Sequence, residues 1–449
     1  MEPVPIAHFS YDDGPDNMSE TPVKLKRFDT PNAAIDITLD GVKQKAHHTW
    51  FRGEHVNFNP KIENMRTPQS VENYVLQGWA PPTPAIGPDT KVVAFGSCFA
   101  ANITKWLAKR NFAVLTEKQG KAANAYVVRF GEGMVNTFVI RQQFEWALDG
   151  KVPEGDLWHG YDATKFGYDE DVRQQTRALF MEADVFIITL GLSEIWYDEP
   201  TGGVFWRAVP QDQYDPSRHK FRVSTVAENR DNIAAIRQVI RRHRPDAKVI
   251  FTLSPIPLVA TFRGNSCITS NSVSKSILRS AIDEFLRGEG ADSESYYWPS
   301  YEIVMDVFDN RWMPDRRHVR KPILDFIMVL FEHTWCHGSE PGLSVAEAWL
   351  HARSTTRAIS PKLSPALKAR DVPTLRRVLG RMEANRDRGK RVFQDDIDLV
   401  REAARNYAQR RPKSRIARWI ANGAPSKAPT ATKRPRPGRA KTRRPVAAE

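Results

Sequence analysis

The sequence predicts an α/β fold in which helices cover a parallel sheet on both faces. Three apolar runs have the length of strands: residues 91–95, 183–190 and 247–253. Helical patterns with one apolar face alternate with them, at residues 99–110, 224–243 and 272–287. Short apolar strands that alternate with amphipathic helices are typical of a parallel sheet buried on both sides.

The first 85 residues are expected to form a loop-rich N-terminal arm. They are rich in Pro, Asn and Asp, and many of their aromatic side chains lack any periodic spacing. One run, residues 34–39, alternates apolar and polar side chains and ends at an Asp40-Gly41 turn, which predicts a strand. Aromatic residues without periodicity favour an arm that lies over another domain.

Residues 86–336 are expected to form the central domain, and each of its elements has a local cause. The strand at 91–95 ends at Gly96, whose freedom at positive φ permits a tight turn into the next helix. The strand at 183–190 ends at Gly191, and the strand at 247–253 ends at Ser254-Pro255. Pro245 stops the helix at 224–243. Residues 302–305 are the expected fourth strand.

The C-terminal quarter carries the positive charge of the chain. Residues 341–449 hold 27 Lys+Arg against 9 Asp+Glu, an excess of 18, while the whole chain has a net charge of +13. The 340 residues before them therefore carry a net charge of −5. We expect a helical basic extension at 337–411, with helices at 345–352, 372–383 and 394–410. Residues 412–449 are expected to be a disordered basic tail.

Composition narrows the class of protein. The chain has 449 residues, 41% of them apolar, with 12 Trp and 22 Phe, which is typical of a globular enzyme. It has no run of about 18 apolar residues, its first twenty residues lack the apolar segment of a secretion signal, and its three cysteines are widely spaced. We expect a cytoplasmic protein with no transmembrane segment and no cofactor.

Candidate catalytic residues lie where strands end. Ser97 follows the first strand, and the helix after it directs backbone N–H groups toward whatever Ser97 attacks. Asp315 and His318 are three residues apart in a predicted loop, so the carboxylate can accept a hydrogen bond from one imidazole nitrogen while the other faces the serine. Cys98 is a rival nucleophile that we expect to be a small buried side chain instead.

The motif Phe95-Gly96-Ser97-Cys98-Phe99-Ala100 resembles the signature of the GSCFA family, a bacterial branch similar to the SGNH/GDSL-type esterases. Further similar segments follow in the same order, at residues 136–145, 189–191, 252–255, 274–279 and 298–303, and the resemblance ends with Asp315 and His318. It covers about residues 88–335. It implies a flavodoxin-like three-layer α/β/α fold, with Ser97 as nucleophile, His318 as general base and Asp315 as the residue that orients it.

The same resemblance implies an oxyanion hole made by the N–H of the serine, a glycine N–H and an asparagine amide. Ser97 supplies the first donor, and Gly131, Gly133 and Gly191 are the candidates for the second. The related enzymes carry Gly-x-Asn-Asp where this chain has residues 191–194, Gly-Leu-Ser-Glu. Ser193 and Asn136 are the candidate replacements for the missing asparagine.

These residues predict an ester hydrolase or O-acyltransferase. The substrate class that the resemblance suggests is an acylated small molecule or carbohydrate, and aromatic residues near the strand ends could form its platform: Trp158, Trp196, Tyr197, Trp206, Trp298 and Trp312. The alternative is a catalytically degenerate binding protein. In either case residues 411–449, with 12 Lys+Arg and one acidic residue, are expected to contact polyanions such as nucleic acid or an anionic membrane surface.

Overall fold

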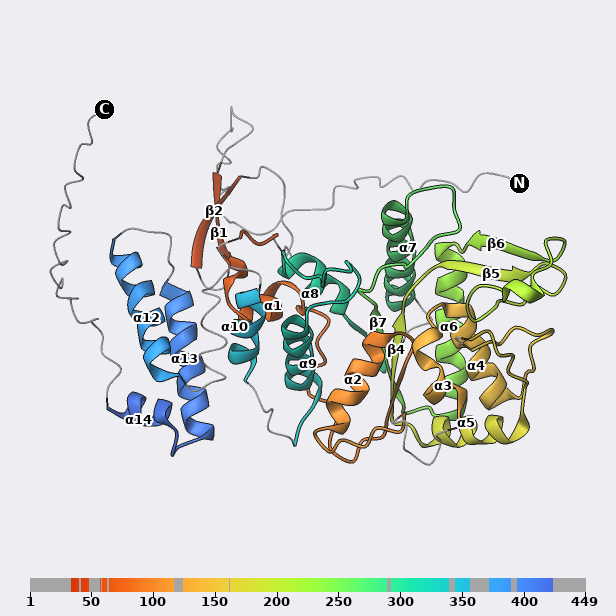
Figure 1. The fold of residues 1–449 in the computed structure, drawn as a ribbon, viewed down its shortest axis with the longest axis horizontal. Helices are drawn as coiled ribbons and strands as arrows, with labels where there is room; N and C mark the ends of the chain where they lie inside the picture. Colours follow the sequence, from red (N-terminus) through yellow and green to blue (C-terminus); the bar gives the residue numbers. More distant parts are fainter. Residues whose placement is uncertain are drawn as a thin grey trace, which may run out of the picture. The chain divides into compact units, whose positions relative to one another are not determined.

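A computed structural model describes residues 34–39, 42–47, 57, 59–62, 64–116, 124–160, 162–288, 292–338, 344–355, 371–388 and 394–422 (Figure 1). The chain divides into two compact units, Met1–Asn59 and Pro60–Glu449. The first unit contains an antiparallel hairpin of β1 (Ala34–Leu39) and β2 (Val42–His47). The strand predicted at 34–39 is confirmed, and it pairs with β2, the next described segment of the chain.

The second unit is built on a parallel sheet with the strand order β3-β4-β7-β8. These strands are β3 (Val92–Phe95), β4 (Val185–Leu190), β7 (Lys248–Leu253) and β8 (Ser295–Trp298). Val114 forms a bridge on the other edge of β3, where Val92 exchanges hydrogen bonds with Ala113 and Leu115, both of 2.8 Å. The chain thus crosses to both sides of β3, and the strand order reverses beside its carboxyl end, where open α/β sheets bind ligands.

Side chains that alternate along each strand enter two separate cores. Along β3, Val92 and Ala94 pack into one core, while Val93 and Phe95 pack into the other. Figure 1 shows helices on both sides of β4 and β7. The first core contains α2 (Cys98–Ala108), α8 (Ser300–Val307), α9 (Lys321–Trp335) and α10 (Val345–Thr355). The second contains α4 (Thr137–Asp149), α5 (Glu170–Glu182), α6 (Val226–His243) and α7 (Cys267–Arg287). The predicted α/β architecture is therefore confirmed, with three layers.

Shorter elements fill the connections. They are η1 (Asn64–Arg66), α1 (Gln69–Tyr74), α3 (Tyr126–Arg129), η2 (Gly131–Gly133), η3 (Gln211–Gln213) and an antiparallel pair, β5 (Glu194–Asp198) with β6 (His219–Val223). Val71 and Leu76 are buried in the first core, so residues 60–85 of the expected arm belong to the second unit. Among the described residues, no helix has the length and apolar character needed to cross a membrane.

The predicted strand at 302–305 is wrong, because this segment lies inside α8, and the fourth strand is β8, a few residues earlier. Ser300 is the first residue of this helix, and its hydroxyl donates to the Leu253 carbonyl oxygen at 3.0 Å, which ties the helix to β7. Ile303, Val304 and Val307 are then buried on one helical face. A short apolar run does not by itself distinguish a buried strand from a helix.

The C-terminal helices agree with the sequence analysis except at the end. After α10 come α12 (Val372–Asp387), α13 (Gln394–Arg410) and α14 (Arg415–Ala421). The last helix buries Ile416 and Trp419, so the prediction of disorder from residue 412 onward is wrong as far as Asn422. Residues 423–449 of the predicted tail lie outside the described residues.

Candidate functional site

The turn after β3 holds Ser97 in an unusual backbone setting. Gly96 has φ +127°, and a Cβ there would lie 2.1 Å from the Thr189 carbonyl oxygen on the neighbouring strand. Ser97 itself is extended and caps α2, with its hydroxyl oxygen accepting the Phe99 N–H at 3.1 Å. Glycine is thus required at 96 by both conformation and space, and the serine is fixed at the amino end of a helix.

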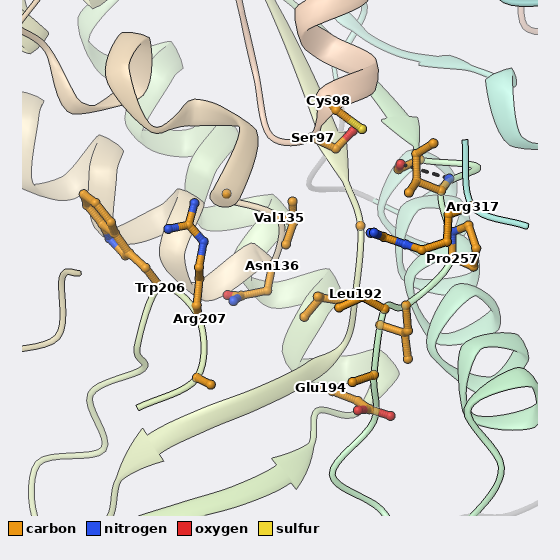
Figure 2. Close-up of a pocket in the computed structure, with 18 of the residues that line it drawn as sticks. Ser97, Cys98, Val135, Asn136, Leu192, Glu194, Trp206, Arg207, Pro257 and Arg317 are labelled. Atoms are coloured by element: carbon orange, nitrogen blue, oxygen red, sulfur yellow. Dashed lines mark hydrogen bonds between the residues drawn. The ribbon is translucent and has the colours of Figure 1, made fainter. Parts of the chain in front are cut away.

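The carboxyl ends of the strands open into a cavity of about 600 Å³ (Figure 2). Ser97 after β3, Gly191 after β4 and Ser254 after β7 all line it. His318, 221 positions after Ser97, lines the same cavity. The fold therefore brings the predicted nucleophile and the predicted base to one pocket, at the reversal of strand order where a ligand site is expected.

Asp315 and His318 form a tight local pair. The Asp315 carboxylate accepts the backbone N–H groups of Arg317 at 3.0 Å and of His318 at 3.1 Å. Its other oxygen lies 2.5 Å from His318 Nδ1, the contact that the spacing predicted. Arg316 between them has φ +57°, a left-handed conformation that is costly for a residue with a side chain.

Hydrogen bonds hold Asp315 in its ionised form. The imidazole of His318 has the largest effect, followed by the two backbone donors, and together they lower the pKa of Asp315 to about 2. The carboxylate accepts a hydrogen bond from the Nδ1–H of His318, so Nε2 of a neutral imidazole is left as an acceptor. This is the tautomer that a general base needs.

The glycine candidates for the oxyanion hole differ in what their amides do. The Gly133 N–H donates to the Phe130 carbonyl at 2.8 Å, and the Gly191 N–H donates to the Val135 carbonyl at 2.7 Å. Gly131 lies outside the lining of the pocket, and its carbonyl accepts the Gly96 N–H at 3.0 Å. The structure thus leaves neither the Gly133 nor the Gly191 N–H available to a ligand.

The two candidates for the missing amide are placed differently. Ser193 is fully buried outside the lining of the pocket, and its N–H donates to the Ser274 hydroxyl at 2.8 Å. Asn136 lines the pocket and caps α4, where its Oδ1 accepts the Val139 N–H at 3.0 Å. That bond assigns the Oδ1 end, so the Nδ2 end is left to donate elsewhere. Asn136 is the better placed of the two.

Cys98, the residue after Ser97, interacts with a buried lysine, Lys275. The sequence analysis expected Cys98 to be a small buried side chain. It is instead half-buried and lines the pocket (Figure 2). Lys275 of α7 is fully buried and donates to the Gly191 carbonyl at 2.6 Å. Burial lowers the pKa of Lys275 to about 7, and its interaction with Cys98 opposes this only in part. The sequence analysis noted the segment at 274–279 but gave Lys275 no role.

The rest of the pocket is largely apolar. Of the aromatic residues proposed from sequence, Trp196 and Trp206 line it, while Trp158 and Trp298 are buried in the cores. Sequence reasoning missed the aromatic and aliphatic residues that complete the wall: Phe221, Ile256, Pro257, Leu258, Val259 and Phe262. The run at 256–260 is a visible apolar loop after a strand, and that signal could have identified them.

Comparison with protein families agrees with these features. Residues 91–331, more than half of the chain, match the model of the GSCFA family, and no curated protein matches the chain. The matched span begins one residue before β3 and ends within α9, so it contains the sheet, Ser97, Asp315 and His318. Both the match and the resemblance found in the motifs lead to one conclusion: the chain belongs to the GSCFA family.

Proposed function

We propose that this protein is a serine-dependent ester hydrolase or O-acyltransferase, in which Ser97, His318 and Asp315 form the catalytic triad. Membership of the GSCFA family indicates a hydrolase-like protein. The observation that carries the finer proposal is the Asp315–His318 pair, in a strained turn, on the same pocket as a serine at a helix N-terminus. A pair that fixes the imidazole tautomer beside a nucleophile is the arrangement that acyl transfer requires.

The proposed reaction has two steps. The Ser97 hydroxyl gives its proton to His318 Nε2, and its oxygen attacks the ester carbonyl carbon. The tetrahedral intermediate collapses when its bond to the alcohol oxygen breaks, and His318 returns the proton to the departing alcohol. Water or a second hydroxyl group then attacks the acyl-serine by the same route, which gives hydrolysis or transfer respectively.

Negative charge on the intermediate needs donors aimed at it. Ser97 caps α2, and in this proposal its own N–H and the helix N-terminus stabilise the oxyanion. The Asn136 amide is the proposed side-chain donor, in place of the asparagine that related enzymes carry after the second strand. The part-exposed aromatic side chains Trp196 and Phe221 in the wall support an acylated carbohydrate as the substrate, because sugar rings stack on aromatic faces.

The proposal is tested with a fluorophosphonate probe, which forms a stable adduct that resembles the tetrahedral intermediate. We expect one equivalent of label, located by mass spectrometry on Ser97 in the peptide that also contains Cys98. The same digest separates the two nucleophiles, since the fragment ions distinguish neighbouring residues. Label on Cys98, or no label together with no turnover of acetylated sugars and aryl acetates, would contradict the proposal.

Replacing Asn136 with aspartate should lower kcat for an aryl acetate by about 10²–10³-fold, the usual effect of losing one oxyanion donor. The carboxylate can still cap α4 by accepting the Val139 N–H, so the helix is retained. The measurement is steady-state kinetics together with thermal unfolding. A variant with unchanged kcat would remove Asn136 from the oxyanion hole.

Replacing Asp315 with asparagine should lower kcat/KM by about 10²-fold, because an amide no longer fixes the Nδ1–H tautomer of His318. Since the pKa of Asp315 is lowered to about 2, its carboxylate stays ionised from about pH 3 upward, and the acid limb of the pH–rate profile should not come from Asp315. Kinetics from pH 4 to pH 9 checks both points. Asp325→Asn, a carboxylate on α9 that binds Lys321, is the matched control.

A further inference from the structure

The pocket contains more positive charge than a neutral ester needs. Four of its lining residues other than Cys98 are ionisable: Glu194, Arg207, Arg317 and His318. Figure 2 shows Arg207 and Arg317 on opposite sides of the pocket. The lining thus includes two guanidinium groups and a single carboxylate.

Arg317 is the more informative of the two. Its backbone N–H binds Asp315, which fixes the residue beside the proposed base, while its side chain extends into the pocket (Figure 2). Its Nε is buried without a hydrogen-bond partner, and the guanidinium forms no ion pair with any carboxylate of the described residues. A buried guanidinium nitrogen without an acceptor is costly, and a ligand that supplies the acceptor removes that cost.

Arg207 occupies space that the chain keeps open for it. It lies directly over Gly133, where a Cβ would be only 1.7 Å from Arg207 Nη2. On its other side, Nη1 is 3.5 Å from the His159 carbonyl oxygen. Any side chain at 133 would displace the guanidinium, so the glycine of this loop serves to place a positive group in the wall of the pocket.

The one carboxylate of the lining is engaged elsewhere. Both oxygens of Glu194 lie within 2.9 Å of the Thr261 hydroxyl, and the side chain is buried at the edge of the pocket. In Figure 2 its carboxylate points away from both arginines. The carboxylate of the lining is therefore directed away from Arg317 and does not neutralise that guanidinium.

We propose that the substrate of this site is an ester whose alcohol portion carries an anionic group, a carboxylate or a phosphate, bound by Arg317 with Arg207 on the opposite wall. This rests on the proposed function, because the catalytic roles decide which portion of the ester lies beside Arg317. His318 protonates the departing alcohol, so the alcohol portion lies on the side of His318, where Arg317 is its neighbour in the chain. The planar fork of a guanidinium suits both carboxylate and phosphate oxygens.

The test compares esters that differ in charge at one position: 4-acetoxybenzoate, 4-acetoxyphenyl phosphate and the neutral methyl 4-acetoxybenzoate. For each enzyme, the ratio of kcat/KM for an anionic ester to that for the neutral ester cancels general losses of activity. We expect this ratio to fall about 10- to 100-fold in Arg317→Met, and less in Arg317→Lys. The ratio is measured separately for the carboxylate ester and the phosphate ester. The ester whose ratio falls more in Arg317→Met carries the anionic group that the site binds better.

Arg287→Met is the matched control, since Arg287 is an exposed arginine on α7 that pairs with Asp283 and lies outside the pocket. It removes the same charge, and its ratio should equal that of the wild type. A wild-type ratio that Arg317→Met does not change would overturn the proposal. Thermal unfolding of each variant shows whether it is folded.

A binding measurement separates this proposal from the proposed function. The amide 4-acetamidobenzoate cannot be turned over readily, and calorimetry compares it with its neutral methyl ester. If no ester is hydrolysed but the anionic amide binds at least 10-fold more tightly than the neutral one, and Arg317→Met removes the difference, the proposed function fails and the anion site stands. Equal binding of the two amides by the wild type would overturn the anion site.

Discussion

Replacing Ser97 with alanine is expected to lower ester turnover by at least about 10³-fold while the protein stays folded. Without the hydroxyl there is no acyl-enzyme, and only binding and the oxyanion donors remain to accelerate the reaction. The hydroxyl also caps α2, so the variant should lose about 1 kcal/mol of stability. The rate of turnover and the free energy of unfolding are both measured, because the two losses have different causes.

A second cap separates these causes. Ser266 caps α7 through the Ile268 N–H and lies outside the pocket, so Ser266→Ala should lose similar stability and keep its activity. Cys98→Ala tests the rival nucleophile and should retain turnover and labelling by the phosphonate. If Cys98→Ala is inactive while Ser97→Ala is active, the nucleophile has been assigned to the wrong residue.

The fold was predictable where each element carries its own signal. The strands that became β3, β4 and β7 are apolar runs closed by Gly96, Gly191 and Ser254, and each ends within a residue of the predicted position. The fourth strand was missed because Ser295–Trp298 is a short aromatic run, whereas the more aliphatic run after it is helical. Only the pairing with β7 and the Ser300 contacts decide between the two.

The residues of the candidate site were likewise predictable only where their contacts are local in the sequence. Asp315 and His318 were predictable because their contact is local and depends on a spacing of three residues. The choice between Ser193 and Asn136 was not, because it depends on which side chain the fold directs into the pocket. Arg207 was invisible for the same reason: its partner, Gly133, is separated from it by more than seventy residues.

Lys275 should make the stability of the protein depend on pH in the alkaline range. Its amine is fully buried against the Gly191 carbonyl, and its pKa is lowered from 10.5 to about 7. Between pH 7 and about pH 10, the folded protein therefore holds this amine neutral while the unfolded chain keeps it protonated. Because the unfolded state binds more protons in this window, stability rises with pH, by up to about 1.4 kcal/mol per pH unit.

Replacing Lys275 with methionine should remove this contribution. Below pH 7 the amine is protonated in both the folded and the unfolded wild type, so the folded state bears the full cost of burying the charge. The stability curves of wild type and variant should therefore differ most in their slopes against pH, between pH 8 and pH 10. Denaturant unfolding at each pH measures the slope directly. Lys321→Met is the control, since Lys321 is exposed on α9 and binds Asp325. Parallel stability curves for wild type and Lys275→Met would show that the buried amine stays protonated in the fold. In that case Lys275 would supply a fixed positive charge near Cys98, the residue after Ser97. Its deprotonation would then appear in the alkaline limb of the pH–rate profile rather than in the stability curve.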